Sequence, residues 1–505
     1  MSLSLSLSPQ LFLSPDDLYP QLGFVVQAFL RVVYGVLLFG HLVLILPHAR
    51  RFFMSERWKG YAQSSWDVDV IQNPIAHPFV MTIWFGCAMA LILGRATVVA
   101  ALINLLLCRY FFVHMRWKGV LRGMGAPGFM TYWLAAAVFL LEYTLYFAPA
   151  LQPLALFVLQ IDFALIMMSA GVYKCSAGFP RNNGMELGLV NPEWGYWWRY
   201  YRQKSPNHPV IWTLNQLAWS TEVMAALLML IPPTRFIGAV LIIISFFFIA
   251  THIRLALLCH MVMLCGVLFF HPGSLGEQLL AFLVSAQKPA VHSAGPILSI
   301  VNQLLAYALW AYLFLLPLSY FGIYYNFFAR KRLPAPLQRI LEVYTNFFGI
   351  IMWRVFTIDL INFFPNIYRQ PRAGGERTLI TRYGWRSGSV RFSHVGESIT
   401  LTCLFTTLKY YPSNNQIFVE RLLRYARTIA CPDNAVLVFE YVGIEKDKKR
   451  FEFTTVTEYI VDPRNATVTE NVLNERYDVR APYAGSPLHE GAKPGSYAPL
   501  MDKPG

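Results

Sequence analysis

Long apolar stretches follow one another through roughly the first two thirds of the chain. A helix that crosses a bilayer needs about 20 mainly apolar residues, and the sequence contains about nine stretches of nearly that length. They cover residues 22–46, 78–94, 95–114, 129–147, 151–173, 210–231, 235–253, 255–271 and 297–328. The eighth is short enough to be half of a broken or re-entrant helix. The sequence therefore predicts a polytopic α-helical membrane protein.

Composition and charge support a membrane location. Of the 505 residues, 56% are hydrophobic and only 14% are charged, whereas a soluble domain is about 25% charged, so a single soluble globule is excluded. Lys and Arg number 42 against 28 Asp and Glu, a net charge of +14. These bases gather at the ends of apolar stretches, as at Arg50, Arg116 and Lys331. This placement indicates membrane lipids as partners and argues against nucleic acid.

The distribution of basic residues predicts an orientation. The connections 47–77, 115–128 and 174–209 are rich in Arg and Lys, whereas the segment 272–294 carries almost none. Basic connections stay on the cytoplasmic side. With nine spans, the N-terminus is expected outside and the C-terminal domain in the cytoplasm.

The chain divides into five regions by composition. Residues 329–368 contain an aromatic stretch interrupted by Glu342, Arg354 and Asp359. This pattern predicts an interfacial amphipathic helix, with a tenth span as the alternative. The regions are an N-terminal segment (1–21), the transmembrane domain (22–328), the interfacial helix (329–368), an α+β soluble domain (369–481) and a disordered, Gly/Pro-rich tail (482–505).

The soluble domain is predicted from alternating and helical patterns. ESITLTCLF, from Glu397, is rich in β-branched residues and predicts a strand. QIFVERLLRYA, from Gln416, predicts a helix with Phe418, Leu422 and Ala426 on the face that meets the strands. AVLVFEYVGI and RFEFTTVTEYIV predict two more strands, joined by the polar hairpin loop EKDKK.

Four ionisable residues in the apolar region are candidate catalytic groups: Lys174, His252, Glu222 and Asp162. A charge at bilayer depth costs about 2.5 to 3.5 kcal/mol and needs a reason. In the structural interpretation Lys174 caps the C-terminus of its helix, and Asp162 or Glu222 hydrogen-bonds a neighbouring helix. In the functional interpretation they border one pocket, in which Lys174 serves as a base. No metal site is expected, because the seven cysteines are isolated and no zinc spacing occurs.

The connection after Lys174 carries an aromatic and basic cluster that includes Trp194, Trp197 and Arg199. Such a cluster is typical of a membrane-interface anchor. The alternative is a lid over a pocket for an amphiphile, in which these three residues contact a lipid, a quinone or a pigment. The residues leave the cofactor unknown.

Several segments together resemble the HTTM domain, the horizontally transferred transmembrane domain of vitamin K-dependent gamma-glutamyl carboxylases and their bacterial relatives. The segments are SAGVYK ending at Lys174, the loop with Gly184 and Trp194, WSTEVMAALLMLIPPTRFIG around Glu222, FFFIATHIRLALLCHMVMLCGVLFF around His252, AFLRVVYGVLLFGHLVLI in the first stretch, and WRVF at Trp353. The resemblance covers about residues 22–367.

The resemblance implies that Lys174 corresponds to the lysine that deprotonates vitamin K hydroquinone, and that His252 corresponds to a functional histidine. The chain departs from the family in two places. The carboxylases carry an Asn-His pair where this sequence reads MRWKGVLRGMGAPGFMTYWL, and their large propeptide-binding region has no counterpart here. Carboxylation of protein glutamates is therefore not expected.

Three functional hypotheses follow, and the residues leave open whether the chain is an enzyme. The first is a non-catalytic subunit or assembly factor of a membrane complex, bound to other membrane proteins and with a lipid, quinone or pigment pocket. The second is a quinone- or lipid-using membrane enzyme with Lys174 as general base. The third is a transporter, which the lack of a clear internal repeat makes the least favoured.

Overall fold

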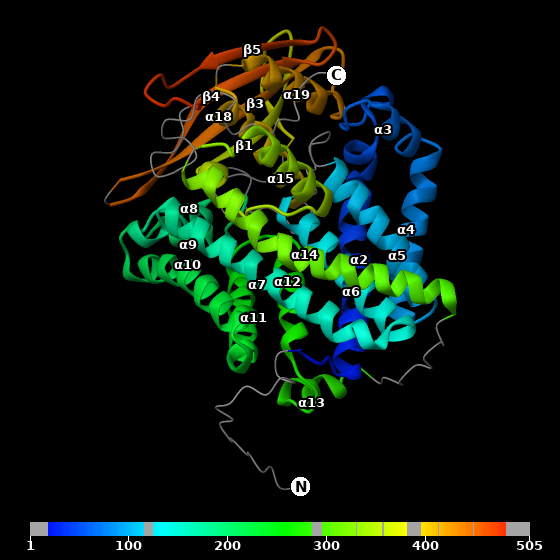
Figure 1. Ribbon diagram of the computed structural model, residues 1–505. Helices are drawn as coiled ribbons and strands as arrows, with labels where there is room; N and C mark the ends of the chain where they lie inside the picture. Colours follow the sequence, from blue (N-terminus) through cyan, green and yellow to red (C-terminus); the bar gives the residue numbers. More distant parts are fainter. Residues whose placement is uncertain are drawn as a thin grey trace.

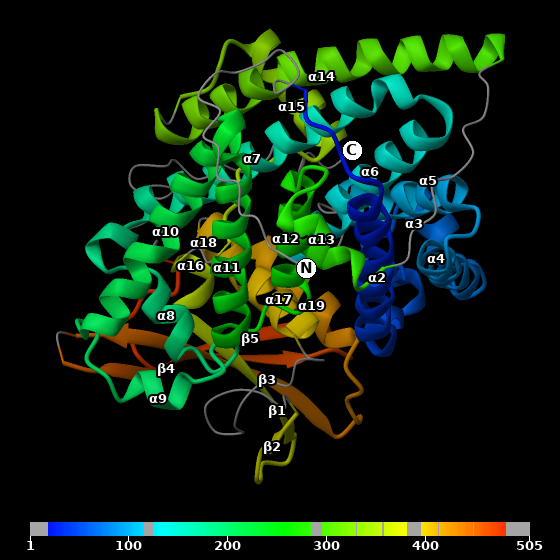
Figure 2. The ribbon, with the colours of Figure 1, turned by 90° about the horizontal axis from the view of Figure 1, so that it is seen from below.

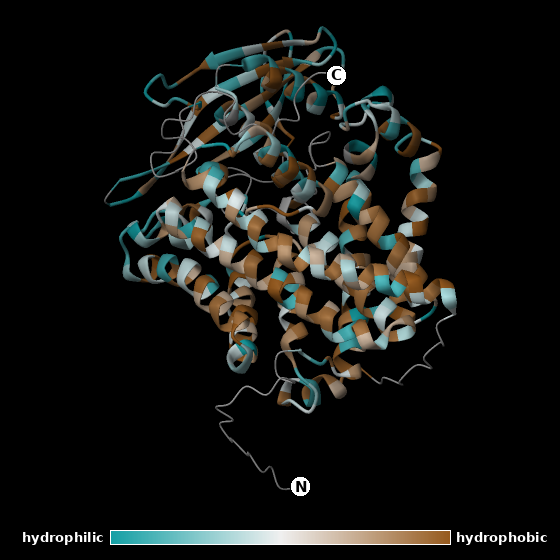
Figure 3. Ribbon diagram, in the orientation of Figure 1, coloured by the Kyte–Doolittle hydropathy of each residue, from teal (hydrophilic) through white to brown (hydrophobic). Residues whose placement is uncertain are grey.

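The structure is a computed structural model in which helices form a bundle beneath a small sheet (Figure 1). It describes residues 19–115, 125–284, 295–329, 331–355, 358–380, 395–412, 414–447 and 449–480. Hydrophobic residues run along the helices, and hydrophilic ones concentrate on the sheet and in the end loops (Figure 3). The predicted N-terminal segment, except its last three residues, and the predicted disordered tail lie outside the described residues.

Seven helices of the described residues are long and apolar enough to cross a membrane. They are α2 (Phe24–Phe53), α4 (Ala76–Leu93), α5 (Thr97–Cys108) with its π-helical continuation η2 (Arg109–His114), α6 (Gly125–Phe147), α7 (Gln152–Ala177), α11 (Arg235–His252) and α14 (Pro296–Phe328). They correspond to seven of the predicted stretches. The chain is thus mostly helical, as the apolar stretches predicted.

The two remaining predicted stretches form less typical helices. α10 (Pro209–Leu230) is 22 residues long, but Asn215, Gln216 and Glu222 make it less apolar. α12 (Leu258–Gly266) continues only through the 3-10 turn η8 (Val267–Phe269) and is shorter than a span. The predicted short piece is therefore a short helix, and its many buried side chains show that it lies inside the bundle.

α14 is the longest helix, with 33 residues. At 1.5 Å per residue it is about 50 Å long, longer than the hydrocarbon core of about 30 Å. It runs obliquely across the outside of the bundle (Figures 1 and 2), and most of its apolar side chains are exposed. A strongly tilted helix accommodates such a length.

The C-terminal part contains an antiparallel sheet with the strand order β2-β1-β3-β4-β5. Helix α19 covers it with a face that includes Phe418, Leu422 and Ala426, all buried as predicted, and Phe418 packs edge-on against Tyr459 of β4. The elements are β1 (Phe363–Pro371), β2 (Thr378–Leu379), α17 (Val395–Phe405), α18 (Thr407–Tyr410), α19 (Asn415–Arg427), β3 (Ala435–Lys446), β4 (Phe451–Asp462) and β5 (Thr467–Val472).

One predicted strand is wrong, because ESITLTCLF lies in helix α17. Its β-branched residues are buried on several sides of the helix, including Ile399, Thr400 and Thr402. Tertiary burial therefore outweighs the β preference of these residues. The predicted strands before and after EKDKK are confirmed as β3 and β4.

The predicted interfacial helix over 329–368 is too long. α15 (Ala335–Phe348) has 14 residues and ends at Gly349, whose φ of +74° terminates the helix in a left-handed cap. It is too short for the tenth span. Strand β1 already begins at Phe363 and pairs with β3 along its whole length, so the sheet domain begins before residue 369.

Short elements connect these parts. They are η1 (Glu56–Trp58), α3 (Trp66–Ile71), η5 (Pro149–Leu151), η6 (Phe179–Arg181), α8 (Met185–Val190), α9 (Trp198–Arg202), η7 (Pro232–Thr234), α13 (Leu275–Ala281) and α16 (Ile358–Ile361). α3, α8 and α9 lie at the end of the bundle that carries the sheet, and α13 lies at the opposite end (Figure 1).

Candidate functional site

The Lys174 ammonium forms a buried ion pair with Glu222. The two residues lie on α7 and α10, and Nζ is 2.5 Å from Oε1. Their side chains are only 3% and 2% exposed. Gly171 permits this approach, because a Cβ there would lie 2.6 Å from a methyl carbon of Val223 on α10. The small residue one turn before Lys174 thus brings the two helices together.

The pair is incompletely hydrogen-bonded. Besides Glu222, the one acceptor of Lys174 among the described residues is the carbonyl oxygen of Ala218, at a long distance of 3.5 Å. The second carboxylate oxygen of Glu222, Oε2, has no hydrogen-bond partner within the described part of the chain. A buried ion pair is favourable only when further hydrogen bonds satisfy its remaining atoms. The loss of one partner should therefore destabilise this ion pair more than its short Nζ–Oε1 distance suggests.

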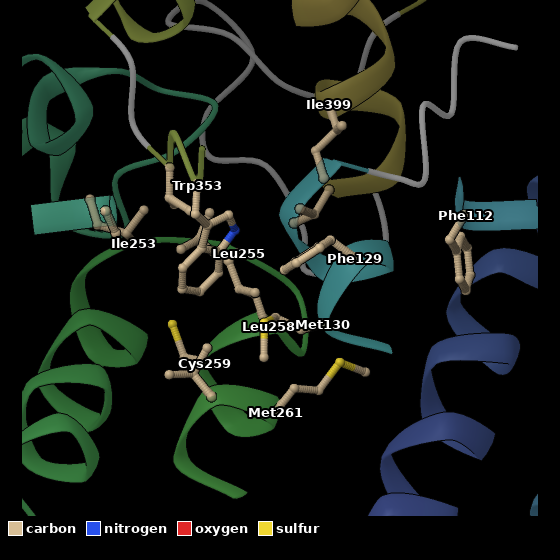
Figure 4. Packing of buried hydrophobic residues seen from close by; sticks show 14 of the residues in the cluster. Phe112, Phe129, Met130, Ile253, Leu255, Leu258, Cys259, Met261, Trp353 and Ile399 are labelled. Atoms are coloured by element: carbon tan, nitrogen blue, oxygen red, sulfur yellow. The ribbon is translucent and has the colours of Figure 1, made fainter. Parts of the chain in front are cut away.

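Residues from two other elements pack on this part of α7. Cys259 of α12 is within electrostatic range of Lys174. The backbone N–H of Trp353 donates to the hydroxyl of Ser169 on α7, at 3.1 Å. Figure 4 shows Trp353 directly above Cys259 in the packed core. The segment after α15 thus contacts α7 at Ser169, five residues before Lys174.

Asp162 does not share this site. Its carboxylate accepts hydrogen bonds from Trp133 Nε1 at 2.9 Å and from the Tyr312 hydroxyl at 3.0 Å. It precedes Lys174 by twelve residues on α7, about 18 Å along the axis. Asp162 joins α6, α7 and α14, and the prediction that it borders one pocket with Lys174 is wrong.

His252 is also separate from the pair. Its Nδ1 lies 2.9 Å from the Thr251 hydroxyl and 3.0 Å from the carbonyl oxygen of Phe248, and its ring stacks on that of Phe248. Among the described residues, His252 forms no hydrogen bond or ion pair with Lys174 or Glu222. Of the four predicted groups, the structure brings only Lys174 and Glu222 together, because helix packing selects one acid for the lysine.

The three aromatic and basic candidates of the loop lie in different environments. Trp197 is exposed, and its Nε1 donates to the carbonyl oxygen of Thr251. Arg199 is exposed too, and its guanidinium lies over the ring of Trp198. Trp194 is buried, and its indole nitrogen has no partner among described residues. Two of the three therefore face the surface, where a membrane anchor would need them.

Sequence analysis missed a second ion pair, in which the buried Glu186 of α8 binds the partly exposed Lys446 at the end of β3. Nζ of Lys446 is 2.6 Å from Glu186 Oε1 and 2.7 Å from Asn183 Oδ1. Glu186 Oε2 accepts from the backbone N–H of Gly184 and from Asn215 Nδ2, at 2.8 and 2.9 Å. Lys446 belongs to the predicted polar hairpin EKDKK, and nothing in that stretch indicates a partner 260 residues away.

A second charged contact joins the sheet domain to the helical bundle. Arg51, at the end of α2, pairs with Glu397 of α17 at 3.0 Å. Tyr425 of α19 donates its hydroxyl to the same carboxylate at 2.8 Å. The sheet domain is thus fixed to the helical bundle at both the α2 end and the α8 end.

No family model, curated protein or solved structure matches the chain. The resemblance to the HTTM domain therefore stays a prediction from the quoted residues. Part of the segment MRWKGVLRGMGAPGFMTYWL, where the family carries its Asn-His pair, lies outside the described residues. Within the described ranges, no group of three or more His, Cys, Asp and Glu side chains could hold a metal ion.

Proposed function

We propose that the chain is an integral membrane protein that acts as a non-catalytic subunit or assembly factor of a membrane complex. Its task would be to hold the sheet domain at a fixed position on the bundle, where a partner can dock. The observation that carries this proposal is the pair of Glu186 and Lys446, because Glu186 is fully buried and fully hydrogen-bonded. A charge-assisted contact of this kind joins two domains rigidly.

The state of Lys174 supports a structural role. Its ammonium is bound by a carboxylate of its own chain inside the bundle. A general base must instead reach a proton on its substrate. Asp162 and His252, which would complete a catalytic group, have separate partners.

A quinone- or lipid-using enzyme remains the second candidate, with Lys174 as base. One observation favours it: Oε2 of Glu222 has a free acceptor position among described residues, next to the lysine. A ligand hydroxyl could donate there and place its oxygen beside Lys174. No comparable observation favours a transporter.

The proposed topology has nine crossings, in which α10 and the short α12 join the seven apolar helices. The connections that hold α3, α8 and α9 carry the basic residues and lie at the sheet end, and α13 lies at the other end (Figure 1). The positive-inside rule then assigns the sheet domain to the cytoplasm and the N-terminus to the outside. Labelling of a cysteine placed at Asn415 by an impermeant reagent from outside would contradict this topology.

The function is tested by purification of the tagged full-length chain in mild detergent, followed by identification of co-purifying proteins, lipids and cofactors. A stoichiometric membrane-protein partner is the expected result. The partner should be lost when Glu186→Ala and Lys446→Ala loosen the sheet domain, and retained with Arg450→Ala in the exposed part of the same hairpin. A monomer that carries a bound quinone would refute the subunit and favour the enzyme.

A further inference from the structure

Buried polar atoms without partners gather where the loop after α8 meets α17 and the segment after α15. Trp194 Nε1, Trp353 Nε1 and Ser398 Oγ form no hydrogen bond to a described residue, and the Glu193 carboxyl group has only the Thr402 hydroxyl as a neighbouring donor among the described residues. All five side chains are nearly inaccessible to solvent. Almost all buried polar groups in proteins have a partner, so such a concentration requires an explanation.

The fold brings these buried polar side chains close to one another. The Thr402 hydroxyl lies within hydrogen-bonding reach of the Glu193 carboxyl group, and the Glu397 carboxylate, also on α17, acts on Glu193 electrostatically. Ser398 precedes Thr402 by four residues, so the two hydroxyls share one face of α17. Figure 4 shows the indole nitrogen of Trp353 on the side of Ile399, which is also on α17. Trp194 follows Glu193 in the chain.

The surroundings indicate an uncharged ligand. Burial raises the pKa of Glu193 well above its ordinary value, the Thr402 hydroxyl partly opposes this, and the Glu397 carboxylate adds to it. A neutral carboxyl group both donates and accepts a hydrogen bond. Glu397 is already paired with Arg51 at 3.0 Å. A charged ligand would therefore meet no free counter-charge among the residues described here.

The surroundings also indicate an amphiphile. Figure 4 shows apolar side chains around Trp353, among them Phe129 of α6 and Leu255 before α12. The polar cluster thus lies at the end of the apolar bundle, where the bundle meets the sheet domain. Sites for small molecules typically combine an apolar lining with a few convergent polar groups.

We propose that Glu193, Ser398, Thr402 and the indole N–H groups of Trp194 and Trp353 bind the hydroxylated head group of an uncharged membrane lipid of the mono- or diacylglycerol class. The indole groups donate to head-group oxygens, and the hydroxyls and the carboxyl group exchange hydrogen bonds with the head-group hydroxyl. The acyl part lies among the apolar side chains of α6 and α12. This site does not depend on whether the chain is a subunit or an enzyme.

The test uses the full-length protein in phosphatidylcholine nanodiscs, with and without dioleoylglycerol. We expect dioleoylglycerol to raise the Tm of the wild-type protein and to remain bound in native mass spectrometry. Trp353→Phe keeps an aromatic ring and removes one donor, and it should weaken binding about tenfold. Trp197→Phe is the matched control, because that indole donates to the Thr251 carbonyl at the surface, and its lipid response should equal that of the wild type.

Thr402→Val provides a second variant, since it removes a hydroxyl at nearly constant volume and should also weaken binding. The proposal is wrong if dioleoylglycerol neither binds nor stabilises the wild-type protein. It is equally wrong if Trp353→Phe and Thr402→Val raise the Tm both with and without the lipid. That result would mean that these polar groups bind no ligand and that removing them only removes the cost of burying them. A Tm that responds to NaCl or CaCl2 instead, and loses this response in Glu193→Gln, would identify a cation site. Partner co-purification reports on the proposed function separately.

Discussion

Two lysine–glutamate pairs in this molecule have almost equal lengths and different surroundings. Lys174 and Glu222 approach to 2.5 Å inside the bundle, and Lys446 and Glu186 approach to 2.6 Å at the domain junction. At the junction, both carboxylate oxygens of Glu186 are bonded, and Lys446 also contacts Asn183. In the bundle, Glu222 Oε2 has no partner among described residues.

The difference shows that distance alone does not describe a buried ion pair. The junction pair belongs to a network in which each atom has a partner, and such networks specify one arrangement. The bundle pair depends mainly on the one bond between Lys174 of α7 and Glu222 of α10. It should therefore respond more strongly when one partner is removed.

The largest effect is expected for Lys174→Met. The change leaves the Glu222 carboxylate buried without its cation and should cost about 3 to 5 kcal/mol of stability. Thermal unfolding in detergent, followed by fluorescence-detected size exclusion, measures it. The double variant Lys174→Met/Glu222→Leu should recover most of the loss, since an apolar pair of similar volume replaces both charges.

Two other outcomes for Lys174→Met would change the comparison. Full stability with loss of a membrane-associated activity would favour the enzyme hypothesis. Full stability with an unchanged phenotype would mean that neither the structural nor the catalytic interpretation of Lys174 holds.

A smaller effect is expected for Glu186→Gln at the junction. The amide keeps hydrogen-bonding capacity but removes the charge that holds Lys446, for a loss of about 2 to 3 kcal/mol. Lys446 is 23% exposed, so its ammonium group can rotate into the solvent, which limits the loss of stability. Hydrogen exchange should rise in peptides of the β3–β4 hairpin and stay unchanged in α2. Protection of the hairpin equal to that of the wild type would show that the pair does not fix the domain.

A third lysine, which is buried outside the two pairs, tests the comparison through pH. Lys409 of α18 donates to the carbonyl oxygen of Asp359 and to Asn362 Oδ1, and burial lowers its pKa from 10.5 to about 8. Between these values the unfolded chain binds more protons than the folded chain, so stability rises with pH. We expect a gain of about 2 kcal/mol from pH 7.5 to 9.5. Chemical unfolding across this range should show the gain, and Lys409→Met should abolish it.

The smallest effect is expected for Arg450→Ala in the same hairpin as Lys446. Arg450 pairs with Glu452, but the two side chains are 72% and 46% exposed. Exposed pairs contribute little, so the change in stability should stay below about 0.5 kcal/mol. Thermal unfolding at low and high salt measures it. A loss as large as that of Glu186→Gln would contradict the role assigned to burial and hydrogen bonding.

Local sequence patterns predicted those parts of the fold that are stabilised mainly by interactions between residues close together in the chain. Seven of the nine predicted apolar stretches form membrane-length helices, because an apolar segment of that length is stable as a helix in a bilayer. The helical spacing of Phe418 and Leu422 predicted α19 and its buried face. Strands β3 and β4 followed from their β-branched and aromatic residues.

The sequence by itself also indicated that Lys174 and Glu222 need partners, since a charge in an apolar helix is costly. Only the tertiary structure decided which partner each one has. Packing across Gly171 joins Lys174 to Glu222, and Asp162 faces Trp133 and Tyr312 instead. In the same way α17 is a helix and Phe363–Pro371 a strand. The reason is physical: such contacts join residues far apart in the chain, and their energy depends on an arrangement that no local pattern encodes.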